Sequence, residues 1–389
     1  EIKVISLRWG NTPMNALGEN DKDISSLIHT QGQLPKPDVF VQVSVPNEFQ
    51  PLGKYNIGIT AGMETTLVHQ EWIDGCNRMD LVIVPSEHSK RTLLDTIYSK
   101  VQNGQEVAKL QVVKPIEVLF EGVDTDLYKP VKDLEKDIVE VLDEIPEDFC
   151  FLQMGHWLQG RHGHDRKDIG KCIETFCKAY DGKKGAPAMV LKTSHATFSV
   201  IDRNLMLDKI KEITRKFSSP PNIYLLHGEL SDSEINSLYN HPKIKAMISF
   251  THGEGYGRPL AEFSTTGKPI ISSWWSGQKD FLKYSVRLVG QVAPVDESSV
   301  WDKVILKESQ WFYVNERFAA KAIKDVRSNY KKFLPNAKRQ QYHINKHFSL
   351  EKMNDDFKKL FDKYVPKPVQ EMTMNLPSFE SMENNYVTS

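Results

Sequence analysis

The stretch that decides the fold is residues 227–282, HGELSDSEINSLYNHPKIKAMISFTHGEGYGRPLAEFSTTGKPIISSWWSGQKDFL. An S-x-x-E capping box that starts at Ser231 predicts the beginning of a helix. The apolar run 246–250 predicts a strand, and Pro259 predicts the first turn of the next helix. The loop 251–257 is therefore expected between the carboxyl end of a strand and the amino end of a helix.

The composition of this loop is typical of a ligand-binding loop. Gly253, Gly255 and Gly257 let the backbone approach a ligand closely, and the free N–H groups at the helix start favour an anion. Glu254 on the loop and Glu262 in the helix could face one pocket and accept hydrogen bonds from sugar hydroxyls. The alternative is that Glu262 complements the helix dipole and that Glu254 is a solvated loop residue.

Short apolar runs alternate with helix-compatible stretches along most of the chain. The first series is KVISL, DVFVQVSV, YNIGIT, DLVIV and IEVLF, and the second is FCFLQM, AMVLKT, NIYLLH, KAMISF and KPIISS. This alternation predicts parallel βαβ layers, so we expect an α/β protein with two open-sheet domains, which bind ligands at the carboxyl ends of strands. The acidic stretch 121–146 separates the series, and its Leu134, Ile138, Val141 and Ile145 suit one helix face.

The composition excludes several classes of protein. The 50 Lys and Arg against 51 Asp and Glu leave a net charge of −1, so no global charge attracts nucleic acid or an anionic membrane. With 40% apolar residues over 389 positions, the chain is neither disordered nor a small disulfide-stapled scaffold. The four cysteines form no C-x-x-C pair, the start EIKVISLRWG lacks a signal-peptide layout, and no apolar run reaches about 20 residues. We therefore expect a soluble cytoplasmic protein with reduced thiols.

The segment EGYGRPLAEFSTTGKPII, residues 254–271, resembles the signature of retaining GT-B-fold glycosyltransferases of family four (glycosyl transferases group 1). Four more segments resemble that family: LVIVPSEHSKRTLL, LFEGVDTDLYKP, FCFLQMG with the following RKDIGKCIETF, and HFSLEKMNDDFKKLFDKY. The resemblance covers roughly residues 80–364.

The resemblance implies two Rossmann-like, doubly wound domains that face a cleft, with a C-terminal helix that crosses back. The implied parts are an acceptor domain (1–120), a linker (121–146), a nucleotide-sugar donor domain (147–345), a returning helix (346–365) and a tail (366–389). The acceptor domain is short for the family and lacks its Gly-rich opening turn, so it is expected to be truncated.

The implied activity is a hexosyltransferase-type transfer from a nucleoside-diphosphate sugar to a hydroxyl of a glycan, lipid-linked or other acceptor, with retention of configuration. No metal or other cofactor and no stable nucleic-acid partner are implied, and any membrane contact would be peripheral. The implied catalytic residues are Glu254, Lys167 and Glu64, and the donor-binding residues are Glu262, Gly255, Tyr256, Gly257, Arg258, His156, Arg161, Arg166 and Leu230.

The implied phosphate-binding group departs from the family pattern at one position. The diphosphate-binding lysine falls on Lys167, but the usual upstream arginine falls on His156. Either Arg161 or Arg166 supplies the missing charge, or His156 acts as a weaker donor. Fixed cations are needed because negative charge grows on the leaving diphosphate. Glu64 stands in for a family histidine near the donor sugar.

Three weaker signals have two interpretations each. The D-x-D at Asp124 suggests a manganese site, but it lies in the interdomain phrase GVDTDLYKP, so we expect no metal there. The basic stretch 321–346 is either a solvated helix face or a surface for an anionic acceptor. Trp274 and Trp275 either stack on a sugar or belong to the core.

Two rival functions stay open at the level of the sequence. One is another GT-B chemistry, a nucleotide-sugar epimerase or a phosphorylase. The other is a non-catalytic module that binds a sugar nucleotide, which the short N-terminal half favours.

Overall fold

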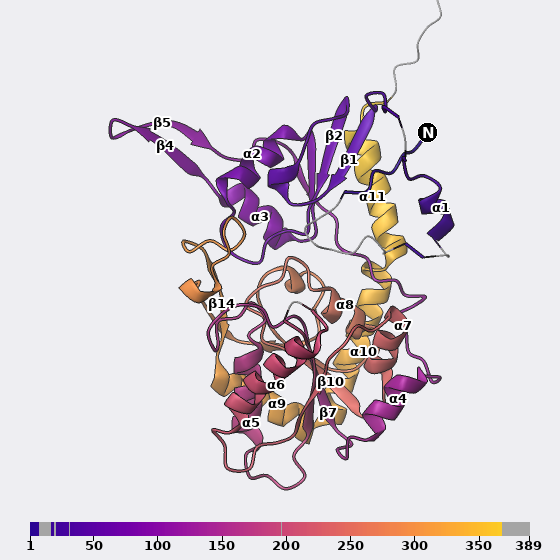
Figure 1. Ribbon diagram of the computed structural model, residues 1–389, viewed down its shortest axis with the longest axis vertical. Helices are drawn as coiled ribbons and strands as arrows, with labels where there is room; N and C mark the ends of the chain where they lie inside the picture. Colours follow the sequence, from indigo (N-terminus) through magenta and orange to yellow (C-terminus); the bar gives the residue numbers. More distant parts are fainter. Residues whose placement is uncertain (8–16, 19–20, 31, 196, 368–389) are drawn as a thin grey trace, which may run out of the picture.

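The computed structural model describes residues 1–7, 17–18, 21–30, 32–195 and 197–367. In this part of the chain, two parallel sheets lie one above the other along the long axis of the molecule, each with its own helices (Figure 1). The α/β class that the sequence predicts is confirmed. Nearly all of the expected C-terminal tail lies outside the described residues.

The first sheet has four parallel strands in the order β1-β2-β3-β6. These strands are β1 (Val39–Val43), β2 (Tyr55–Ile59), β3 (Leu81–Val84) and β6 (Ile116–Val118). Because side chains alternate across a strand, Val82 and Val84 pack with helices α2 (Gln70–Arg78) and α3 (Glu87–Asp95) on one face, and Leu81 and Ile83 pack on the other. A strand buried on both faces explains the continuous apolar run of β3.

Two features of the N-terminal half differ from the sequence prediction. The run KVISL forms no strand of this sheet but a single bridge between Val4 and Ile28, because its apolar residues Ile5 and Leu7 are not covered by any described layer and stay exposed. An unpredicted antiparallel hairpin, β4 (Tyr98–Gln102) and β5 (Gln105–Leu110), projects from the domain (Figure 1). Its largely polar, exposed residues carry no periodic apolar signal.

The second sheet has six parallel strands in the order β12-β11-β10-β7-β8-β9. They are β7 (Cys150–Met154), β8 (Ala188–Lys192), β9 (Ile223–Leu226), β10 (Ile244–Ser249), β11 (Ile270–Ser273) and β12 (Val286–Leu288). The chain order reverses between β7 and β10. In open α/β sheets the loops at such a reversal form the ligand crevice, at the carboxyl ends of the strands.

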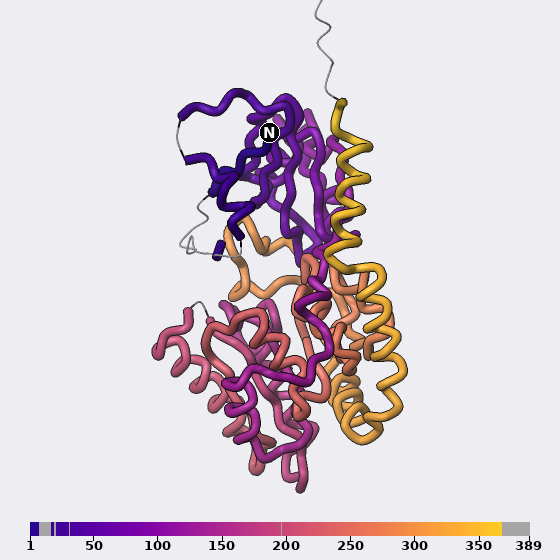
Figure 2. The backbone as a smooth tube through the Cα atoms, turned by 90° about the vertical axis from the view of Figure 1, so that its right-hand side faces the viewer, coloured from indigo at the N-terminus to yellow at the C-terminus, as the bar shows by residue number. Residues whose placement is uncertain are grey.

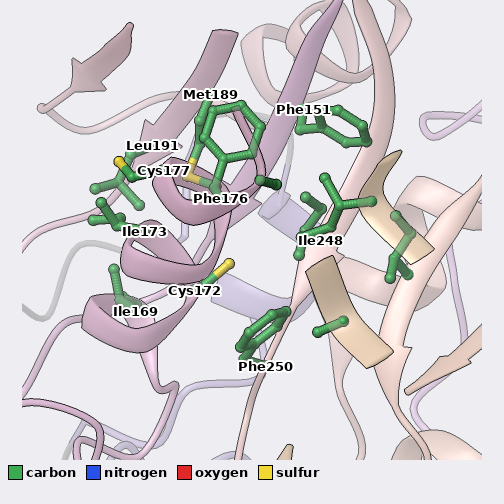
Figure 3. Close-up of a cluster of buried hydrophobic side chains, with 14 of the residues drawn as sticks. Phe151, Ile169, Cys172, Ile173, Phe176, Cys177, Met189, Leu191, Ile248 and Phe250 are labelled. Atoms are coloured by element: carbon green, nitrogen blue, oxygen red, sulfur yellow. The ribbon is translucent and has the colours of Figure 1, made fainter. Parts of the chain in front are cut away.

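Helices cover both faces of the second sheet. One face packs against α5 (Ile169–Tyr180), α6 (Val200–Thr214) and α9 (Glu316–Ser328), in the core that Figure 3 shows. The other packs against α4 (Lys136–Asp143), α7 (Asp232–Asn240), α8 (Arg258–Ser264) and α10 (Tyr330–His347). The capping box predicted at Ser231 is confirmed at the start of α7. In α4 the buried residues are Ile138 and Leu142, whereas Val141 is exposed, so the predicted apolar face was partly wrong.

The last helix joins the two halves. After α10, helix α11 (Leu350–Tyr364) runs back along the first sheet, where Phe357 and Phe361 pack against Ile57, Leu81 and Ile83 (Figure 2). The remaining elements are α1 (Lys22–Ser25), the ribbon β13 (Gly290–Pro294) and β14 (Gln310–Val314), and three 3-10 turns, η2 (Pro46–Glu48), η3 (Gly277–Lys279) and η4 (Glu297–Ser299).

The four cysteines are buried and free, as the sequence predicts. Among the described residues, no helix combines the length and apolar character that a bilayer crossing needs.

Candidate functional site

A buried ion pair lies at the strand-order reversal of the second sheet. Lys167 precedes α5, and Glu254 lies in the loop after β10. The Nζ atom of Lys167 is 2.5 Å from Oε1 and 2.6 Å from Oε2 of Glu254, and the two residues are only 9% and 7% exposed. Glu254 is therefore not the solvated loop residue of the alternative interpretation.

A second ion pair crosses from one half of the molecule to the other. Arg166 Nη1 donates to Oε1 of Glu64 over 2.6 Å, and Glu64 comes from the loop after β2 of the first sheet. Burial alone disfavours the charged form of Glu254, but the positive charges of Lys167 and Arg166 outweigh it and lower the pKa of that carboxyl. We expect Glu254 to be ionised near neutral pH.

The loop before α5 is fixed by local hydrogen bonds. Asp165 Oδ2 accepts from the backbone N–H of Ile169 at the helix start, and burial raises the pKa of Asp165 to about 6. The carbonyl oxygen of Arg166 accepts from the N–H of His252, over 3.0 Å. The loops after β7 and β10 are thus bonded to each other, which holds Lys167 beside Glu254.

Two further basic groups lie near Lys167. His156 follows β7 and pairs through Nδ1 with Ser194 Oγ at 3.1 Å. Lys192 ends β8, and its Nζ donates to the carbonyl of Gly228 over 2.5 Å. Partial burial, and then the positive charges of Arg166, Lys167 and Lys192, lower the pKa of His156. We call His156, Arg166, Lys167 and Lys192 the cationic cluster.

Lys192 was missed by the sequence prediction, although a signal for it exists. It lies at the carboxyl end of a strand in the run AMVLKT, the position at which open sheets bind ligands. Burial lowers the pKa of Lys192, and no carboxylate pairs with it within the part of the chain that the structure describes.

Arg161 does not join the cationic cluster, which corrects one of the two sequence alternatives. Its side chain is 72% exposed and pairs with Asp296 at 2.7 Å. The exposed insert that carries Arg161 bonds to the η4 turn through its N–H to Ser298 Oγ, and this contact turns the guanidinium away. Arg166 is the arginine that lies beside Lys167.

Two of the loop glycines are required by contact between the halves. A Cβ on Gly253 would lie 2.2 Å from the carbonyl oxygen of Glu64, and one on Gly255 would lie 2.2 Å from that of Ala61. The close approach that the sequence assigned to a ligand is made here by the N-terminal loop. Gly257 has φ +107° and caps α8, a conformation that glycine adopts without strain.

Glu262 lies inside α8 with two polar partners. Its carboxylate accepts from Arg258 Nε at 2.9 Å and from the hydroxyl of Tyr239 at 3.3 Å, and the residue is 5% exposed. Burial raises the pKa of Glu262 despite the nearby guanidinium. Because it is past the first turn and buried, it is not a surface residue that only complements the helix dipole.

Glu254 and Glu262 do not line the same cavity in this structure. The small space beside Glu254 is lined by Lys167, Gly257 and Pro259, but not by Glu262. Its free volume is about 10 Å³, too little for a ligand. All lining residues of this space lie in the second half of the molecule, and a ligand group that bonds to Lys167 there would compete with Glu254.

Glu121 is a site residue that the sequence prediction missed. It lies in the crossover between the halves, and burial together with the charges of Glu254 and Glu262 raises its pKa. The positive charge of Arg258 lowers the pKa of Glu121 in part. Glu121 therefore lies near both acids, and only its place in LFEGVDTDLYKP, directly before the Gly, could have pointed to it.

Tyr256 and Leu230 have mainly apolar surroundings. The Tyr256 ring packs on Phe281 with centroids 4.8 Å apart, and its buried hydroxyl finds no hydrogen-bond partner among the residues that the structure describes. Leu230, in the loop before α7, is half-buried and packs against the apolar core between the second sheet and helices α4, α7, α8 and α10.

The weaker sequence signals have structural explanations. Asp124 Oδ1 accepts from the backbone N–H of Asp126 at 2.9 Å, which is a turn contact. Trp275 packs edge-on against His88 of the first half, with centroids 4.7 Å apart, and the Arg287 guanidinium lies 3.8 Å from the Trp274 ring centroid. Within the described ranges, no three His, Cys, Asp or Glu residues gather as a metal site would require.

The chain has the fold of GT-B glycosyltransferases, as comparison with solved structures shows. No protein-family model matches the sequence, and no curated protein matches it. At the low identities found, the structural similarity shows the fold alone.

Three of the similar structures illustrate the match. Sucrose-phosphate synthase from Thermosynechococcus elongatus is 11% identical with a TM-score of 0.56, over 84% of this chain and 73% of that one. The Escherichia coli trehalose-6-phosphate structure bound with UDP-2-fluoro glucose is 10% identical with a TM-score of 0.60, over 86% and 75%. Anabaena HepE in complex with UDP and glucose is 13% identical with a TM-score of 0.52, over 79% and 72%.

Proposed function

We propose that this protein is a glycosyltransferase that moves a sugar from a nucleoside-diphosphate sugar to an acceptor hydroxyl. The observation that carries the proposal is the buried contact of Lys167 with Glu254 at the strand-order reversal. A cation there can bind a departing diphosphate, and the carboxylate can accept from sugar hydroxyls. The GT-B fold and the resemblance of residues 254–271 support the same function.

The cationic cluster is proposed to bind the diphosphate. Arg166 carries a permanent charge, whereas burial lowers the pKa of Lys167 although the charge of Glu254 opposes this. Lys192 adds an amine at the end of the neighbouring strand, and His156 adds a weaker donor. Electrostatic stabilisation of the leaving group supplies most of the rate enhancement in such reactions. The N–H groups of the loop 255–257, at the start of α8, would contribute further.

The carboxylates are proposed to contact different parts of the donor. Glu254 would bind the transferred sugar, Glu262 the ribose, and Glu64 would reach the sugar from the opposite half. Leu230 would pack near the base. The acceptor, a glycan, lipid-linked or other hydroxyl, would enter from the first half.

We propose that transfer proceeds with retention and without a metal. The acceptor oxygen bonds to the anomeric carbon from the face that the diphosphate leaves, and the acceptor proton passes to the leaving phosphate oxygen. No enzyme nucleophile is needed. Addition of EDTA should leave the rate unchanged, and NMR of the product should show the anomeric configuration of the donor.

The donor is expected to compete with the two ion pairs of the site. The diphosphate would replace Glu254 as the partner of Lys167 and Glu64 as the partner of Arg166. Closing of the halves around the donor would then exclude water and limit hydrolysis.

The direct test is a thermal-shift panel of UDP-, GDP- and ADP-sugars, followed by transfer assays with the ligands that bind. A donor at 100 times its Kd raises stability by about 2.7 kcal/mol. UDP-glucose comes first, because structures of similar fold contain UDP and glucose. Absence of any shift across the panel would contradict the proposal.

The second candidate is a non-catalytic module that binds a sugar nucleotide. This candidate is favoured by the ion pairs Arg166–Glu64 and Lys167–Glu254, because these charged groups have partners without a ligand. If Glu254→Gln abolished turnover but left the biological activity intact, this candidate would be preferred. An epimerase is tested by incubating donor alone, because only an epimerase releases isomerised sugar.

A further inference from the structure

A second cavity lies in the C-terminal half, away from the site described above. It has a volume of about 550 Å³ and lies between the turn 281–284 and helix α10. Its charged lining residues are Lys283, Lys338 and Arg339, with His343 and His347 beside them. It shares no lining residue with the cavity at Glu254. We call this space the α10 groove.

The cations of the α10 groove have no acidic partners. Helix α10, YKKFLPNAKRQQYHINKH, contains no Asp or Glu. In the part of the chain that the structure describes, none of Lys283, Lys338 and Arg339 forms an ion pair. Lys338 Nζ lies 3.2 Å from a Gln341 amide oxygen, and Lys283 lies 5.8 Å from the centroid of the Tyr284 ring. Several helix lysines elsewhere in the molecule lie beside carboxylates, as Lys171 and Lys178 do beside Glu174.

A buried glutamine fixes the shape of the α10 groove. Gln340 is 2% exposed, accepts from the N–H of Tyr284 at 2.9 Å and donates to the carbonyl of Phe281 at 2.8 Å. These two bonds hold the turn that carries Lys283 against α10, the helix that carries Lys338 and Arg339. The groove is therefore a built concave site and not a chance gap between flexible side chains.

We propose that the α10 groove binds a small phosphorylated molecule with two or more negative charges. Lys283, Lys338 and Arg339 line the groove, and cations without carboxylate partners lower the free energy of such a bound anion. Charge-assisted hydrogen bonds are the strongest that side chains make. A volume of about 550 Å³ is within the range of small-molecule pockets. Tyr284 and Tyr342 add ring surfaces at the rim for the organic part of the ligand.

A small ligand fits the α10 groove better than a membrane or nucleic acid does. A membrane-binding helix needs a broad exposed apolar face beside its cations. On α10 the strongly exposed large apolar side chain is Tyr342, and Ile344 is buried. Nucleic acid binds to cations spread along a strip, whereas these cations line one open depression of about 550 Å³.

The test is calorimetric titration of pyrophosphate into the full chain, with and without saturating UDP. The groove variant is Lys338→Glu/Arg339→Glu, and the matched control is Lys321→Glu/Lys324→Glu on the exposed face of α9, which has the same charge change. We expect the groove variant to weaken one class of pyrophosphate sites about tenfold or more, and the control to retain it. Lys338→Gln/Arg339→Gln should give an intermediate loss.

Three results would overturn the proposal. The first is equal weakening in the groove and control variants, which would indicate unspecific electrostatics. The second is absence of a pyrophosphate site that survives saturating UDP. The third is that the wild type binds phosphatidylglycerol vesicles or a DNA duplex but not pyrophosphate, and that the groove variant loses this binding. Failure of UDP-, GDP- and ADP-sugars alike to bind would contradict the proposed function but would leave the comparison of the two charge-reversal variants valid.

Discussion

The amine of Lys167 is shared between both carboxylate oxygens of Glu254, although the two residues are 87 positions apart in sequence. Each charge is buried, so each depends on the other, and removal of one partner of a buried pair typically costs about 3–5 kcal/mol. The pair keeps a cation ready at the strand-order reversal. A diphosphate that enters can replace one anionic partner of Lys167 with another.

The substitution Glu254→Gln tests this relationship. We expect the free energy of unfolding to fall by about 3–5 kcal/mol because Lys167 loses its counter-charge. Sugar transfer should fall by roughly 100-fold or more, whereas UDP should bind at least as tightly, because Lys167 no longer has an anionic competitor. Urea unfolding, transfer assays and calorimetry check these three outcomes.

A matched control for this substitution is Glu212→Gln on α6. Glu212 is exposed, and its contact with Arg215 is 4.0 Å long. The substitution Glu212→Gln should change neither the free energy of unfolding nor the rate of sugar transfer. Full transfer activity in a folded Glu254→Gln protein would contradict the role proposed for the carboxylate.

Lys192→Ala tests the basic residue that the sequence prediction missed. Lys192 is 8% exposed, and among the described residues no carboxylate forms an ion pair with its amine, so its removal should change stability little. Loss of a charge-assisted hydrogen bond to the diphosphate should raise the Kd for UDP about tenfold. Calorimetry of this variant and of Lys184→Ala, an exposed lysine in the turn after α5, separates the effect from general charge loss. Equal affinities in the two variants would place Lys192 outside the diphosphate site.

Gly255→Ala tests the contact between the halves. The added Cβ would lie 2.2 Å from the Ala61 carbonyl oxygen, so either the loop shifts or the halves separate. We expect a loss of about 1–3 kcal/mol in stability and a larger radius of gyration by small-angle X-ray scattering. In the control Gly18→Ala the nearest atom is 3.8 Å away. An unchanged radius and melting temperature in Gly255→Ala would show that the halves need not touch there.

Glu117 gives a prediction for pH. It accepts from Lys363 at 2.9 Å and from the Tyr364 hydroxyl, which fastens α11 to the first sheet. Burial alone would raise the pKa of Glu117, but these hydrogen bonds lower it from 4.5 to about 2. Because the folded-state pKa is depressed, Glu117 stabilises the folded protein above about pH 4.5 and loses this effect as the pH falls towards 2.

The measurement is urea unfolding of wild type and Glu117→Gln between pH 7 and about pH 2. The two proteins should differ most at neutral pH and converge at the acid end. The control is Asp355→Asn at an exposed position of α11, the helix that carries Lys363 and Tyr364. Its stability difference from wild type should show no such convergence. A stability difference that grew towards low pH would contradict the assignment.

The sequence by itself determined the α/β class, the strands of the second half and the loop that carries Glu254. Apolar runs, a capping box and helix-breaking residues act over a few positions, so local physics is enough to predict them. The same local signals could not distinguish the exposed run KVISL from a strand, because burial depends on whether a second layer covers it.

Tertiary structure alone decided which charges meet. Arg166 and Arg161 are five positions apart in one loop, yet one lies beside Lys167 and the other pairs with Asp296 at the surface. The two ion pairs of the site, Lys167–Glu254 and Arg166–Glu64, join residues 87 and 102 positions apart, and no spacing in the sequence encodes such contacts. They arise because the strand-order reversal brings two loops together and the returning helix α11 holds the opposite half against them.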